Sequence, residues 1–204
     1  MNYTLDTAAA KAANAGGRID ATGKYRGKIK HAIMFTNRNG TDAVEFEFTD
    51  STGSAATLTL WTRNEKNPKL SGFNVLMSMM TVCAIKSLNG VNRVIKKYDY
   101  EQKETVDTTV LVAPEFDGKE ITLLLQREEY EKNDGGIGYR MNIFAAAQHS
   151  TDLTANEILE RKTQPEELFK LMERLADKKA KPKAGGSKPA QYAPIEDLDD
   201  GIPF

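Results

Sequence analysis

Cations at alternate positions mark one segment of the chain as a candidate for binding nucleic acid. Lys or Arg occupies every second position from residue 24 to residue 30, so a β-strand would carry all four on one face. A later strand pattern, Ala55 to Thr62, puts Trp61, the only tryptophan, on its outward side. Cations neutralise phosphates and an exposed ring stacks on any base, which is the chemistry of sites for unpaired strands. The residues predicted to contact single-stranded DNA are Lys24, Arg26, Lys28, Lys30, Trp61, Arg63, Lys66 and Lys69.

Other interpretations of these residues stay open from the sequence. The cationic strand can be a solvated face, or an edge strand whose charges prevent aggregation. Trp61 can equally be covered by later helices. A second group of cations, with Tyr98 and Tyr100 beside it, can add a further edge to the basic surface. Its members are Lys86, Arg93, Lys96 and Lys97.

Residues of the kinds used in catalysis or metal binding are few and scattered. His31 and His149 are far apart in sequence, and Cys83 is the only cysteine, which excludes a disulfide within the chain and any zinc-ligand spacing. The adjacent acidic pairs at 128–129 and 166–167 are interpreted as solvated charges. We therefore predict no enzyme, no cofactor, no catalytic residue and no metal site.

The net charge conceals a segregated distribution. The chain carries 28 Lys+Arg and 29 Asp+Glu, a net charge of −1, which by itself argues against a nucleic-acid binder. Residues 1–98, however, hold 14 basic and 7 acidic residues, whereas residues 99–177 hold 9 and 18. We expect the acidic half to face away from DNA, to shield the protein or to dimerise.

A three-stranded meander begins the folded part. In residues 24–36 the alternation puts Tyr25, Ile29, Ile33 and Phe35 on one face, and Asn39-Gly40 is a hairpin signal. A two-residue loop there places Phe35 opposite Val44 and Ile33 opposite Phe46. The same register puts Glu45 and Glu47 near Met34 and Ala32, beyond the lysine cluster. In the third strand, Leu58 and Leu60 point inward.

The elements after the meander complete a barrel order. Ser71 is the predicted N-cap of a buried helix from Gly72 to about Leu88. Strands are expected around 108–113, 119–130 and 138–146, followed by helices at 155–162 and 165–177. Three strands, a helix and a returning hairpin give a mainly β (β+α) fold. We predict an OB-fold-like five-stranded barrel with a buried helix, insertions and a C-terminal helical addition, followed by a disordered tail.

The last ten residues form a second candidate site, for a protein partner. Four carboxylates precede an apolar end, and the residues before them are rich in Lys, Pro, Ala and Gly, a composition that does not form a core. Such a peptide suits an apolar pocket with a basic rim. This ending resembles the acidic tip of bacterial and phage single-stranded DNA-binding proteins. By that resemblance the partner-binding residues are Asp197, Asp199, Asp200, Ile202, Pro203 and Phe204.

The whole chain resembles phage-encoded single-stranded DNA-binding proteins. The tip is the specific match, and segments 17–25, 97–100 and 124–131 add a looser likeness. The body does not resemble the short tetrameric bacterial domain. The expected divisions are a mobile N-terminal arm (1–17), a DNA-binding domain (18–177), a flexible basic linker (178–195) and an acidic tip (196–204).

The resemblance implies a protein that coats single-stranded DNA and recruits replication, recombination or repair proteins through its tip. Two alternatives stay open: a recombination accessory or annealing protein, and a decoy that engages host repair enzymes. A homo-oligomer is possible. No run approaches the roughly 18 apolar residues of a membrane span, and the N-terminus has no apolar signal region. The expected location is the cytoplasm of a bacterial host.

Overall fold

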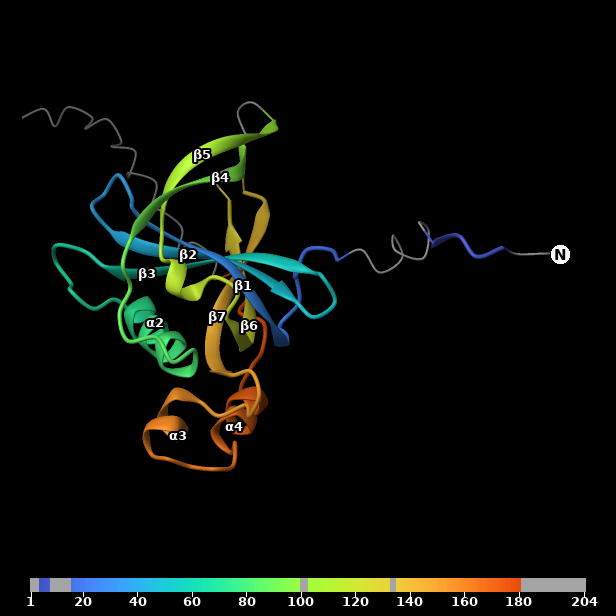
Figure 1. The fold of residues 1–204 in the computed structure, drawn as a ribbon, viewed down its shortest axis with the longest axis vertical. Helices are drawn as coiled ribbons and strands as arrows, with labels where there is room; N and C mark the ends of the chain where they lie inside the picture. Colours follow the sequence, from blue (N-terminus) through green and yellow to red (C-terminus); the bar gives the residue numbers. More distant parts are fainter. Residues whose placement is uncertain (1–3, 8–15, 100–102, 133–134, 181–204) are drawn as a thin grey trace, which may run out of the picture.

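The fold is mainly β, as predicted. The computed structural model describes residues 4–7, 16–99, 103–132 and 135–180. Seven antiparallel strands form one sheet in the order β3-β2-β1-β5-β4, with β6 beside β1 and β7 beside β6 (Figure 1). The strands are β1 (Gly23–Thr36), β2 (Asp42–Asp50), β3 (Ala55–Arg63), β4 (Val91–Asp99), β5 (Glu104–Val112), β6 (Glu120–Glu131) and β7 (Ile137–Gln148). Among the described residues β3 and β7 do not pair, so the sheet is open rather than a closed barrel.

Short helices complete the described part of the chain. They are α2 (Ser71–Val82), the 3-10 turn η1 (Pro114–Phe116), α3 (Ala155–Leu159) and α4 (Glu167–Glu173). The main core lies between the inner face of β1, β2, β3, β6 and β7 and one face of α2, with Phe46 packed edge-on against Phe116 at 5.1 Å. None of the helices described is long and apolar enough to cross a membrane.

The predicted register of β1 against β2 was wrong by one residue. Asn37 N–H donates to Thr41 O (2.9 Å) and Thr36 lies opposite Asp42, so the loop holds three residues and Gly40 closes it with φ +71°. A three-residue loop with glycine in the left-handed region is the next commonest hairpin after the two-residue type.

A β-bulge then changes which face of the sheet the side chains of residues 31–36 of β1 point to. Ile29 lies opposite Phe48 and His31 opposite Glu47, which leaves Lys30 as an extra residue. Ile29 therefore points into the core, whereas Ile33 and Phe35, predicted on the same face, point away from it. Ala32 and Met34 take their places against the core.

The helix α2 is shorter than the predicted segment 72–88, and only one of its faces is buried. Leu70, not Ser71, is the N-cap residue. The helix ends at Val82 because Ala84 adopts φ +54°, where its N–H donates to Thr81 O and the next N–H, of Ile85, donates to Met80 O. This Schellman arrangement usually has glycine at the left-handed position, so the sequence carried no signal for it.

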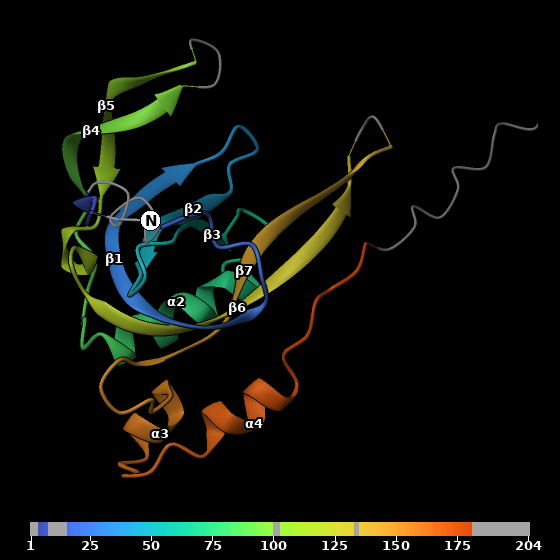
Figure 2. The same ribbon diagram turned by 90° about the vertical axis from the view of Figure 1, so that its right-hand side faces the viewer.

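Two long hairpins rise on either side of the β1–β3 meander (Figure 2). The β4–β5 hairpin branches from β1, where Ile33 lies opposite Val112. Sequence patterns predicted only part of β5 and missed β4. The β6–β7 hairpin pairs with β1 only as far as Leu125, and its far half continues beyond the meander. The predicted C-terminal helical addition is confirmed, and α3 and α4 lie at the opposite end from the hairpin tips (Figure 2).

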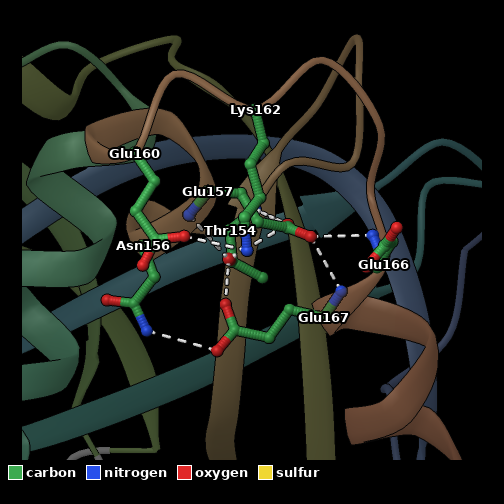
Figure 3. Close-up of polar contacts among 7 residues, drawn as sticks. All are labelled: Thr154, Asn156, Glu157, Glu160, Lys162, Glu166 and Glu167. Atoms are coloured by element: carbon green, nitrogen blue, oxygen red, sulfur yellow. Dashed lines mark hydrogen bonds and ion pairs between the residues drawn. The ribbon is translucent and has the colours of Figure 1, made fainter.

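A buried carboxylate ties α3 to α4 (Figure 3). Glu157, only 1% exposed, accepts hydrogen bonds from the backbone N–H groups of Thr154 (2.8 Å), Glu166 (2.7 Å) and Glu167 (2.8 Å). Burial alone would raise the pKa of Glu157, but these hydrogen bonds outweigh it and lower the pKa. The side chain of Glu167 in turn accepts from Asn156 Nδ2 and Thr154 Oγ1. The acidic pair at 166–167 was predicted to be solvated. Glu166 is exposed and contributes only its backbone N–H, whereas the carboxylate of Glu167 is part of this network.

Replacing Glu157 with glutamine should lower the free energy of unfolding by about 1–3 kcal/mol, because an amide NH2 would face backbone donors that now share a charged acceptor. Urea unfolding at neutral pH measures the change. Glu160→Gln is the matched control, since Glu160 is exposed and Lys162 is its one ion-pair partner among the described residues; its effect should stay within about 0.5 kcal/mol. Equal unfolding midpoints for the two variants would contradict this role for Glu157.

Candidate nucleic-acid interface

The outer face of β3 presents an aromatic pair. Trp61 is 40% exposed and Phe35, on β1, is 37% exposed, and the rings meet edge to face at 5.8 Å and 75°. Ala43 of β2 lies between them in the sheet and is covered to 2% exposure. The outward direction of Trp61 was predicted and is confirmed. Phe35 was predicted to face the core, and it joins Trp61 because of the bulge at Lys30.

Close packing of α2 fixes the backbone beneath Trp61. Gly72, in the first turn of α2, lies so near β3 that a Cβ there would be 2.4 Å from the carbonyl oxygen of Trp61. Only glycine permits this approach without a shift of backbone. The start of the helix therefore supports the strand at the residue from which the exposed tryptophan projects.

A groove of about 590 Å³ lies between the β1–β3 face and the β4–β5 hairpin; we call it the arm groove. Its floor carries Lys30 and two carboxylates of β2, and its wall is formed by β4. The polar and aromatic side chains that line it include Arg18, Lys30, Glu45, Glu47, Thr57, Lys96, Lys97 and Tyr98. Four of these are cations. The cluster around Lys96, Lys97 and Tyr98 had been considered from sequence only as a further edge, and Tyr100 lies outside the described residues.

A second groove of about 540 Å³ separates β3 from β7; we call it the β3–β7 groove. Trp61 lines it from β3, Arg140 and Asn142 line it from β7, and Lys178 borders it. Thr57 lines both grooves, so they meet on the outer face of β3. An extended chain lying across this face would pass from the β4–β5 hairpin to the β6–β7 hairpin and contact Trp61 on its way.

Glu128 anchors the cations of the β3–β7 groove. Its carboxylate accepts hydrogen bonds from Lys178, Arg140 (2.8 Å) and Asn142 (2.6 Å), and the bond from Lys178 leads the effects that lower the pKa of Glu128 to about 2. Glu128 is 8% exposed, so the prediction that it is a solvated charge was wrong. The backbone of Lys178 also bridges to β6 at Glu128, which holds this segment against the sheet.

The first half of the cationic strand lies away from both grooves. Lys24 and Arg26 each reach the carboxylate of Asp152 at 2.6 Å, and Asp152 is 7% exposed. Burial alone would raise the pKa of Asp152, but the hydrogen bonds from these two cations bring it below the usual value. Lys28 faces Glu120 at 3.5 Å. These three cations therefore hold the loop before α3 and the start of β6 against β1.

The remaining predicted cations lie nearer Trp61. Lys30 lines the arm groove and faces Glu47 at 3.3 Å. The observed register explains this contact. Glu47 lies beside the bulge, and not opposite Ala32 as predicted. Arg63 pairs with Asp42 at 2.6 Å. Lys66 and Lys69, in the loop after β3, have no ion pair with any described carboxylate, and Lys69 lies 5.6 Å from the Phe73 ring centre.

Sequence reasoning missed several residues of this surface. Arg18, Phe35 and Arg140 were not proposed, although Arg18 lines the arm groove and stacks on Tyr139 at 5.2 Å. Arg127 also lies over this ring, at 4.6 Å from its centre. No sequence signal identifies the contact of Arg18 with Tyr139, because the two residues lie more than a hundred positions apart. The residues predicted to bind a partner, Asp197, Asp199, Asp200, Ile202, Pro203 and Phe204, lie outside the described residues.

Neither a metal site among the described residues nor a matched relative indicates a function. Among the described residues, no group of three or more His, Cys, Asp or Glu side chains could hold a metal ion. Cys83 is buried, and this burial raises the pKa of its thiol to about 11. Comparison with protein-family models and with curated proteins finds no match. A function must therefore be inferred from the residues of the two grooves.

Proposed function

We propose that the chain binds single-stranded DNA without sequence preference along the outer face of β1–β3. One observation carries the proposal: the exposed Trp61–Phe35 pair and the cation-lined arm groove lie on one continuous face. Aromatic rings that stack on bases next to cations that neutralise phosphates are the two requirements of a sequence-tolerant single-strand site. Lys30, Lys96, Lys97 and Arg18 would follow the phosphates, and Trp61 would receive a base.

The strand order supports an OB-fold interpretation. The pairing β3-β2-β1-β6-β7, with α2 between β3 and β6, follows the order of that fold, and β4–β5 would then be an insertion after the helix. OB-folds bind oligonucleotides on the face of their second and third strands, between two loops. The two hairpins that flank the β1–β3 face (Figure 2) would take the positions of such loops.

The central test is a titration with oligo-dT followed by the emission of Trp61. Because Trp61 is the only tryptophan, a base stacked on it should quench the protein's tryptophan signal directly. Quenching that saturates and is reversed by salt supports the proposal. Absence of any binding at low salt would exclude it and leave the decoy alternative. Accelerated pairing of complementary strands would instead indicate an annealing protein.

We further propose that the acidic tip recruits replication, recombination or repair proteins in the cytoplasm of a bacterial host. Deleting residues 197–204 should leave affinity for oligo-dT unchanged or raise it, since the deletion removes carboxylates that repel phosphates. The same deletion should abolish capture of a partner that binds the isolated tip peptide. Anisotropy with labelled oligo-dT measures the first effect, and a strong loss of DNA binding would contradict the assignment of the tip to a protein partner.

A further inference from the structure

Two carboxylates lie on the floor of the arm groove, although carboxylates repel the phosphates of DNA. Glu45 and Glu47 project from the outer face of β2, and both line the groove. Glu45 Oε1 lies 2.8 Å from Lys97 Nζ, and Glu47 Oε2 lies 3.3 Å from Lys30 Nζ. Two of the groove's four cations are therefore already neutralised by side chains of the protein.

In each of these two ion pairs, the lysine side chain is more exposed than the carboxylate. The side chains of Glu45 and Glu47 are 19% and 26% exposed, whereas those of Lys97 and Lys30 are 44% and 63% exposed. The carboxylates are held in the middle strand of the meander. The lysines have long flexible stems and an ammonium group that can turn toward a new acceptor at little cost. An arriving phosphate would therefore draw the lysine away from a carboxylate that stays in place.

We propose that Glu45 and Glu47 are built-in competitors of the DNA phosphates, each holding one lysine until a phosphate replaces it. This inference rests on the proposed function, and it specifies the ligand as a chain of phosphodiesters. Exchanging one carboxylate for the phosphate of a free nucleotide gains little. A polyanion gains more, because it engages several cations at once and releases its condensed counterions. The carboxylates thus lower affinity in general and favour strands over mononucleotides.

The pair at Lys97 has a second consequence, for the β4–β5 hairpin. Lys97 belongs to β4 and Glu45 to β2, so their contact joins the hairpin to the groove floor. At the base of the hairpin, Arg93 pairs with Asp117 at 2.5 Å and Ile95 packs with Ile33. A phosphate that takes Lys97 would open the outer contact and leave the base intact.

The test compares two double variants that change net charge equally. Glu45→Gln with Glu47→Gln frees Lys97 and Lys30 in the groove. Glu160→Gln with Glu173→Gln removes two exposed charges outside it, and also frees one lysine, Lys162. Anisotropy with labelled oligo-dT across salt concentrations should show the groove variant binding about tenfold tighter or more at low salt. Its log–log salt slope should be steeper by about 0.7 for each freed lysine. The control variant should match the wild type within about threefold.

Each outcome decides the matter. If wild type binds oligo-dT and the groove variant binds no tighter than the control, the competitor role is wrong and the proposed function stands. Weaker binding by the groove variant would overturn it too, because the carboxylates would then be supports of the site. Glu47→Gln alone keeps the Lys97–Glu45 contact, so it tests whether the effect comes from a loosened hairpin. This single variant should still bind about threefold tighter or more. If no version binds, the proposed function itself fails.

Discussion

Replacing Trp61 with alanine is expected to weaken binding of oligo-dT by about 1–3 kcal/mol, which is roughly a 5- to 150-fold rise in Kd. The ring is 40% exposed, its edge contact with Phe35 holds it upright, and it lines the groove between β3 and β7. Because the substitution removes the only tryptophan, anisotropy of labelled oligo-dT must replace fluorescence quenching as the measurement.

The control for this result is Phe169→Ala. Phe169 is a large exposed ring, 55% accessible, but it lies on α4, outside both grooves. Its loss should change Kd by less than about twofold, since an aromatic ring contributes only where a base can stack on it. Equal behaviour of the two alanine variants would remove Trp61 from the binding site. The salt slope of Trp61→Ala should equal that of wild type, because no phosphate contact is lost.

The sequence predicted β3 well and β1 poorly, for a reason that lies in their patterns. β3 alternates without interruption, so Leu58 and Leu60 point inward and Trp61 outward, as expected. In β1 an extra residue at Lys30 divides two alternating halves that have opposite phase. Apolar side chains occur in both phases of the outer half, with Ile33 and Phe35 in one and Ala32 and Met34 in the other. Periodicity alone therefore cannot detect the bulge.

The candidate site was predictable in its chemistry but not in its location. Alternation put Lys24, Arg26 and Lys28 on one face correctly, yet the partner of the first two, Asp152, is 126 positions or more away. Ion pairs over such separations have no sequence signature. The same limit applies to Lys96 and Lys97 of β4, which the sequence offered only as a further edge. They line the groove because their hairpin folds over β2. The cations of the proposed site are thus Lys30 at the bulge and Lys96 and Lys97 of β4, rather than those at the start of β1.

Charge reversal inside and outside the arm groove separates these two locations in a single experiment. Lys28 and Lys30 are two positions apart on β1, similarly exposed, and each faces one glutamate. Lys30 lines the arm groove and Lys28 does not. Lys96, exposed and without an ion pair to any described residue, also lines it. Lys30→Glu with Lys96→Glu should weaken oligo-dT binding about 100-fold or more at low salt, because two phosphate contacts become repulsive.

The matched variant is Lys28→Glu with Lys170→Glu, which makes the same change in net charge outside the groove. Its Kd should rise by less than about fivefold, through long-range repulsion alone. The salt slope discriminates further: the groove variant should lose about 1.4 from the log–log slope, at about 0.7 per phosphate, and the matched variant almost nothing. If the variant with Lys28→Glu loses as much affinity for oligo-dT as the variant with Lys30→Glu, the DNA follows the whole of β1. DNA would then have to displace Lys24 and Arg26 from Asp152, and the arm groove would not be the principal site.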